Sequence, residues 1–113
     1  MAPTGVANAG ESCTPDPPNL AMETDEHGTN YIFAFAKMVC KRTGSGTVSI
    51  ILYEDGEAIG RSSGSSLDTD VFTQLTPTCH AVPENVHYFM MATFNDALIT
   101  HELTASLNTK CLT

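Results

Sequence analysis

Four cysteines, Cys13, Cys40, Cys79 and Cys111, are spread widely along this chain of 113 residues. No two of them are close enough in sequence to form a C-x-x-C motif or a local metal knuckle. Wide spacing in a short chain is typical of disulfides that support a small core in an oxidising compartment. The sequence therefore predicts two disulfides and a secreted or extracytoplasmic protein, with its signal segment removed from the mature chain.

Residues 29–40 form an apolar run in which both odd and even positions are apolar. Such a strand is either central in its sheet or covered on both faces. Residues 1–28 are rich in Pro, Gly, Asp and Glu, and we expect an arm pinned by Cys13, not a layer of strands. Residues 29–113 are then expected to form one domain.

The dipeptide Asp55-Gly56 separates two strand-like runs and predicts a β-hairpin with a type I′ turn. Closure by two residues places Leu52 opposite Ile59. The Ser-rich residues that follow, 62–70, are predicted to form a long, mobile loop that leads into a short strand.

A second, longer hairpin is predicted between residues 86–94 and 97–107, with a two-residue turn at Asn95-Asp96. This register pairs Tyr88 with Leu103, Met90 with His101 and Ala92 with Ile99. Turn signals recur every eight to twelve residues or so, and no helical period is present. The sequence therefore predicts a small antiparallel β-sandwich, immunoglobulin-like in general architecture, with a small closed β-barrel as the alternative.

The register of the second hairpin also predicts the disulfide connectivity. It brings Cys79 and Cys111 within one β-bulge of each other, which leaves Cys13 to pair with Cys40. Each bond closes a loop of about thirty residues, worth about 3 to 4 kcal/mol in the chain-entropy model.

Charge limits the possible partners, because thirteen acidic residues face five basic ones and the formal net charge is −8. Phosphate backbones and anionic bilayers repel such a protein, so we expect no nucleic acid partner and no membrane insertion. An acidic surface favours a basic partner.

Histidine and acidic residues are the candidates for a metal site. The histidines are His27, His80, His87 and His101. Their close candidate pairs are His80 with Cys79 and His80 with His87, but no four-ligand set with local spacing can be drawn, so we expect no metal and no cofactor. His101 falls on the apolar face of the second hairpin and is expected at the edge of the core. Asp68-Thr-Asp70 resembles the start of a calcium loop but lacks its central glycine and distant glutamate, which favours a solvated turn.

Most aromatic side chains are expected to fill the core. Phe89 and Met91 are the exception, because they fall on the opposite face of their strand from the main apolar stripe. If nothing covers them, they form an exposed patch suited to a partner.

No catalytic residue is assigned, since the chain has no G-x-S-x-G elbow and is too small for a deep carboxylate cleft. We expect a non-enzymatic binding module that engages another macromolecule, such as a protein, through sheet surface or loops. Its predicted binding residues are Phe89, Met91, His87, Arg61, Asp68 and Asp70. One alternative is a secreted protease inhibitor with a disulfide-braced loop at residues 76–83. The other is a small hydrolase that uses acidic residues and either His80 or His87.

Overall fold

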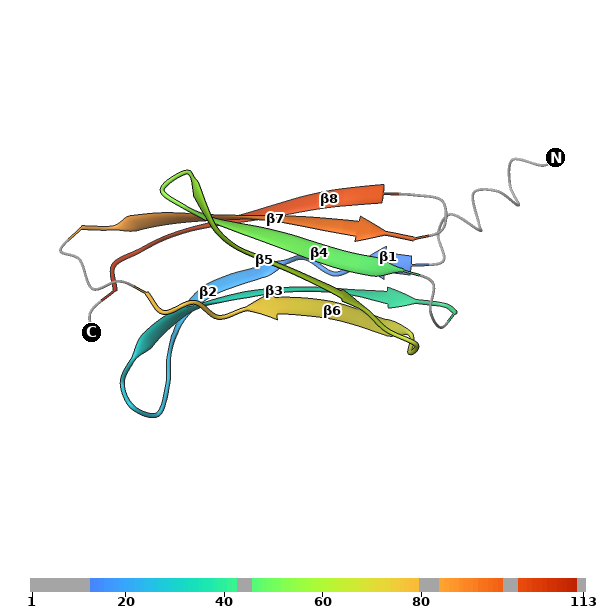
Figure 1. Cartoon of the computed structure of the whole chain (residues 1–113), viewed down its shortest axis with the longest axis horizontal. Coiled ribbons are helices and arrows are strands. Elements are labelled where there is room, and N and C mark those ends of the chain that lie inside the picture. Colours follow the sequence, from blue (N-terminus) through green and yellow to red (C-terminus); the bar gives the residue numbers. More distant parts are fainter. Residues whose placement is uncertain (1–12, 43–45, 80–83, 97–99, 112–113) are drawn as a thin grey trace.

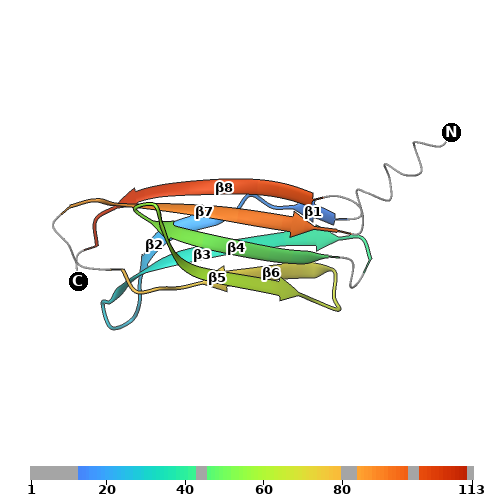
Figure 2. The same cartoon turned by 45° about the horizontal axis from the view of Figure 1, so that its top comes forward.

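Two antiparallel sheets pack face to face in the computed structural model, which describes residues 13–42, 46–79, 84–96 and 100–111 (Figures 1 and 2). Sheet A contains β1 (Cys13–Pro15), β2 (Asn19–Thr24), β3 (Asn30–Cys40) and β6 (Asp70–Leu75). Sheet B contains, in spatial order, β5 (Glu57–Ser65), β4 (Thr47–Glu54), β7 (Val86–Asn95) and β8 (Thr100–Thr109). The sheets do not close into a barrel over the described residues, so the predicted sandwich is confirmed.

β3 is the central strand of sheet A, one of the two placements that its apolar run allows. β1 and β2 pair one after the other with the same edge of β3, and β6 pairs with the other edge. The expected arm without strands is therefore wrong for residues 13–24, while residues 1–12 lie outside the described residues. Pro17 and Pro18 fall between β1 and β2, at the edge of the sheet, where a missing N–H group interrupts no ladder.

The β4–β5 hairpin has the predicted two-residue turn, with Asp55 and Gly56 both at positive φ, 48° and 86°. The register predicted beyond this turn is wrong by one residue, because Leu52 lies opposite Gly60 and not opposite Ile59. A β-bulge beside Leu52 inserts one extra residue into β5 and shifts every later pair.

β5 continues to Ser65, so most of the predicted loop over residues 62–70 is wrong, and only residues 66–69 connect β5 to β6. Ser and Gly pair here along β4 as an ordinary strand. Gly64 has a steric role, since a Cβ atom at this position would collide with the carbonyl oxygen of Phe72 in β6. Glycine therefore lets the two sheets approach at this edge.

The β7–β8 hairpin forms, but its predicted register is wrong by four residues. Tyr88 lies opposite Leu107, Met90 opposite Ala105, Ala92 opposite Leu103 and Asn95 opposite Thr100. Because four is an even number, every described side chain keeps the parity predicted for it, and the apolar pattern cannot distinguish the two registers. The Thr100 hydroxyl donates a hydrogen bond to Oδ1 of Asn95 over 2.7 Å, at the base of a loop longer than the expected turn. Ile99 lies outside the described residues.

Small and aliphatic side chains fill most of the space between the sheets. The buried set comprises Ile32, Ala34, Ala36, Met38, Val48, Ile50, Leu52, Val71, Val86, Tyr88, Met90, Ala92, Phe94 and the four cysteines. Both predicted disulfides are confirmed, Cys13–Cys40 between β1 and β3 and Cys79–Cys111 at the other end of the core. The second pairing is correct although the hairpin register that predicts it is displaced.

Candidate binding surfaces

Six of the eight aromatic side chains lie outside the core, contrary to the expectation from the sequence, and all eight are among the described residues. Sheet A carries Tyr31, Phe33, Phe35 and Phe72 on its outer face, and sheet B carries Tyr53 and Phe89. Tyr88 and Phe94 are the two that are fully buried. Apolar side chains that face solvent in groups are typical of interaction sites, so each outer face is a candidate binding surface.

The outer face of sheet B carries four contiguous large side chains at the centre of the sheet, which we call the sheet B patch: Ile51, Tyr53, Phe89 and Met91. Ile51 of β4 lies opposite Met91 of β7, and Tyr53 lies opposite Phe89. The Tyr53 and Phe89 rings pack with their centroids 6.0 Å apart and their planes tilted by 48°. All four side chains remain partly exposed.

A shallow hollow of about 330 Å³ lies over one end of the sheet B patch. It is lined by Tyr53, Gly56, His87, Phe89 and Met91. The β4–β5 turn forms part of its wall and is tied to β7, because the backbone N–H of His87 donates to Oδ1 of Asp55 and the N–H of Asp55 donates to the His87 carbonyl. Nδ1 of His87 lies 2.8 Å from Oδ1 of Asn108, which fixes the imidazole ring at the rim.

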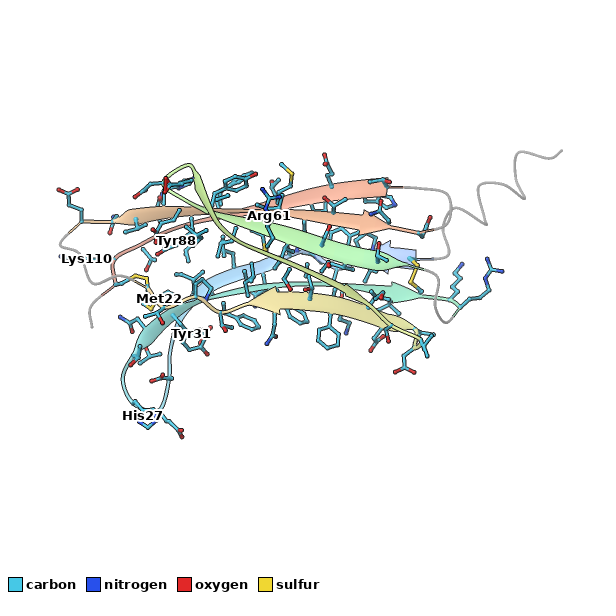
Figure 3. All side chains as sticks on the ribbon, in the orientation of Figure 1. Met22, His27, Tyr31, Arg61, Tyr88 and Lys110 are labelled. Atoms are coloured by element: carbon cyan, nitrogen blue, oxygen red, sulfur yellow. A yellow bond between two sulfur atoms is a disulfide. The ribbon has the colours of Figure 1, made fainter. Side chains whose placement is uncertain are left out.

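The structure brings four of the six predicted binding residues together. Phe89, Met91 and His87 line the hollow, and Arg61 projects beside the patch from β5, opposite Ile51 (Figure 3). The other two lie elsewhere. Asp68 is in the turn that precedes β6, where its N–H donates to the Ser66 hydroxyl. Asp70 pairs with Val39 in sheet A. Asp70 therefore belongs to sheet A, and Asp68 lies in the connection that leads to it.

Beneath the patch lies Tyr88, the largest fully buried side chain among the described residues. Its hydroxyl donates to Oε2 of Glu54 over 2.7 Å and lies 3.5 Å from Sγ of Cys79. Burial raises the pKa of Tyr88 well above its ordinary value of 10.0, and the hydrogen bond to Glu54 and the charges of Glu54 and Asp55 raise it further. The phenol is therefore held neutral as a structural hydrogen-bond donor.

Over the described residues, no three His, Cys, Asp or Glu side chains gather as a metal site requires, and no helix is long and apolar enough to cross a membrane. His101 does not lie at the core edge as expected. It shares the inward parity of Phe94, its partner in β7, but belongs to the exposed first half of the edge strand β8. His80 and residues 80–83 of the suggested inhibitor loop lie outside the described residues.

The aromatic row on sheet A is the feature that sequence reasoning missed. The Phe33 and Phe35 rings stack with centroids 5.8 Å apart, and Phe35 and Phe72 follow at 5.9 Å. The sequence does contain a signal for this row. Within β3 the aromatic rings occupy alternate positions, and Ala34 and Ala36 lie on the opposite face. The face with the large rings could therefore have been assigned to the outside.

The sequence matches no protein-family model and no curated protein. The fold, however, is similar to part of a solved structure of Parabacteroides merdae β-glucuronidase, with a TM-score of 0.58 and 8% sequence identity over 86% of this chain. A second structure of that enzyme, with glycerol in its active site, gives a TM-score of 0.56 and 10% identity, also over 86% of this chain. The match spans only 13% and 14% of the enzyme chains. At this level of identity the likeness shows a shared β-sandwich fold.

Proposed function

We propose that this protein is a secreted, non-enzymatic binding module that engages another macromolecule, most simply a protein, through the outer face of sheet B. One observation carries the proposal: Ile51, Tyr53, Phe89 and Met91 form a contiguous, partly exposed patch beside a hollow. None of these four side chains packs in the core, since all of them point away from it.

The chemistry of the patch is that of a protein interface. Aromatic residues, Met and Arg are enriched at the buried centres of such interfaces, and the patch offers Tyr53, Phe89 and Met91 with Arg61 at its margin. A large side chain from a partner that fills the hollow would desolvate both rings, which is the usual environment of a binding hot spot.

The patch also sits where the sheet is most constrained. β4 and β7 are the two inner strands of sheet B, paired on both edges, and the turn at Asp55 is hydrogen-bonded to His87. A surface held in this way loses little conformational entropy on binding, which favours affinity.

We also propose that the protein is secreted and that its partner is basic. Two disulfides in a small domain are consistent with an extracellular location. Glu57 and Asp55 are exposed at the turn beside the hollow, and the chain has a formal net charge of −8, so a basic partner would associate faster at low salt.

Quantitative capture from the native extracellular medium tests this function. Immobilised wild-type protein is compared with Phe89→Asp/Met91→Asp, and with Ser63→Asp/Ser65→Asp as a matched control. The control adds two charges to β5 of the same sheet, at positions opposite Ser49 and Thr47 and not opposite any residue of the patch. We expect the first variant to fold and lose the partner and the control to keep it. If the folded patch variant retains every partner, the proposed face is wrong.

A further inference from the structure

A second hollow, of about 470 Å³, lies on the outer face of sheet A, on the far side of the sandwich from the sheet B patch. Its floor is made by Tyr31 and Phe33 of β3. On one side stands Asp25 from the β2–β3 turn, and on the other stand Gln74, Thr76 and Thr78 from β6 and its continuation. We call this feature the sheet A hollow. Its volume is in the usual range for small ligand sites.

The walls of the sheet A hollow are fixed by backbone hydrogen bonds. Oδ1 of Asp25 accepts from the N–H groups of His27 and Thr29, at 2.8 and 2.9 Å, which holds the carboxylate in the turn. Gly28 allows the turn to close, with φ of 82°. On the other side, Thr78 bridges to Tyr31 and aligns the continuation of β6 beside β3. Figure 3 shows His27 at the tip of this turn, with Tyr31 nearer the sheets.

Negative charge surrounds the aromatic floor. Glu23 lies opposite Tyr31 in the β2–β3 ladder, and Glu26 is exposed in the turn beside Asp25. Lys37, a basic residue of the same face, lies opposite Phe72, three alternate positions along β3 from Tyr31. An anionic ligand is therefore disfavoured at the sheet A hollow, and a cation is attracted to it.

We propose that the sheet A hollow binds a lysine or arginine side chain from a basic segment of a protein partner. A cation placed over Tyr31 and Phe33 interacts with the faces of the rings. Asp25 supplies a carboxylate for its N–H donors, and Gln74 with the threonine hydroxyls accepts the remaining hydrogen bonds. A wholly apolar occupant would displace water from Gln74 and the threonine hydroxyls without replacing its hydrogen bonds, which is unfavourable.

This inference rests on the proposed function only in assuming a macromolecular partner, and it assigns chemistry to a different face. The two ideas can therefore fail separately. Variants that disrupt the sheet B patch should still bind an isolated cationic peptide at the sheet A hollow, because the two surfaces belong to opposite sheets.

A titration followed by NMR tests the proposal on the full chain. The probe is a capped heptapeptide with Arg at three alternate positions, and its control is the same peptide with neutral citrulline at those positions. We expect shift changes at Asp25, Tyr31, Phe33 and Thr76 with the arginine peptide, and binding at least about tenfold weaker with citrulline. Binding should also weaken as salt is raised.

Variants then separate the roles of charge and ring. Asp25→Asn keeps the Oδ1 acceptor that the turn requires but removes the charge, and Phe33→Leu removes the ring; each should weaken binding by about fivefold to tenfold. Phe33→Tyr should bind as the wild type does, and so should Phe89→Asp/Met91→Asp. Equal binding of the citrulline peptide, or shift changes confined to sheet B, would overturn the proposal. So would shift changes at these residues with neutral cellohexaose and none with the arginine peptide.

Discussion

The space between the two sheets and the outer faces of the same sheets are built from different kinds of side chain. β3 shows this along a single strand, because Ala34 and Ala36 point into the core while Phe33 and Phe35 point outward. Small side chains inside let the sheets pack closely. Large rings outside contribute little to that packing, and large exposed apolar groups are the informative exception on a protein surface.

Sheet B shows the same alternation of faces without the difference in size, because β7 places Tyr88, Met90 and Ala92 inward and Phe89 and Met91 outward. Among these three inward side chains, Tyr88 carries the polar group, and its hydroxyl donates a hydrogen bond to Glu54 and lies 3.5 Å from Sγ of Cys79. We infer that the inner faces provide the stability of this protein and the outer faces its recognition.

Two adjacent isoleucines of β4 test this contrast with the largest expected effect. Ile50 is buried, 1% exposed, whereas Ile51 belongs to the sheet B patch. We expect Ile50→Ala to lower the free energy of unfolding by about 2 to 5 kcal/mol, because it opens a cavity. Ile51→Ala should cost less than about 1 kcal/mol. Urea unfolding of both variants measures the difference, and equal costs would remove the distinction between the faces.

Two glycines of β5 test how closely the sheets approach at that edge. A Cβ atom on Gly64 would collide with the backbone of Phe72, whereas on Gly60 it would meet the movable side-chain end of Leu75 at 3.3 Å. Gly64→Ala should therefore destabilise the protein by about 1 to 3 kcal/mol, and Gly60→Ala by less. A thermal unfolding comparison in which Gly60→Ala is the more damaging change would contradict this packing.

Tyr88 makes a pH-dependent contribution from the inner face. Its pKa is raised in the folded protein, chiefly by burial, so the folded state keeps a proton that the unfolded chain releases above about pH 10. This stabilisation is complete below pH 10 and is lost as the pH rises further, toward the folded-state pKa. Tyr88→Phe should cost about 1 kcal/mol at neutral pH, because Glu54 loses its donor.

The variant should also flatten the decline in stability between about pH 10 and 11.5. Tyr53→Phe is the matched control on the outer face, since it removes the same hydroxyl group from a partly exposed tyrosine. An identical slope in Tyr88→Phe and wild type would show that Tyr88 is not buried as described.

We expect the smallest change in the free energy of unfolding from the variant that should weaken binding most. Phe89→Asp/Met91→Asp should change the free energy of unfolding by no more than about 1 kcal/mol, because both side chains are partly exposed and point away from the core. Ser63→Asp/Ser65→Asp gives the baseline for two added charges. A loss of several kcal/mol in the patch variant alone would mean that Phe89 and Met91 belong to the packed structure.

Features that depend on local chemistry could be predicted from the sequence. Asp55-Gly56 predicts its turn because positive φ is needed at both positions, and the apolar run of β3 predicts a central strand. The two disulfides are also predicted correctly, and Phe89 and Met91 fall on the outer face by parity alone.

Features that depend on the alignment between strands could not be predicted from the sequence. A four-residue displacement of β8 keeps each side chain on its face, so Leu103 or Leu107 serves equally well opposite Tyr88 in an apolar pattern. The bulge beside Leu52 and the pairing of the Ser-rich end of β5 have no distinctive local sequence. For the sheet A hollow, Asp25 and Thr78 are brought together only by the fold.

Methionine oxidation within β7 tests the central claim most directly. Met90 is 0% exposed in the core, and its neighbour Met91 faces outward in the sheet B patch. Under limiting hydrogen peroxide, mass spectrometry should show Met91 oxidised at least about tenfold faster than Met90 in the free protein. After capture of the partner from the native medium, Met91 should become protected from oxidation. Equal rates for the two methionines, or a Met91 rate unchanged by the bound partner, would contradict the division between a stabilising interior and a binding exterior.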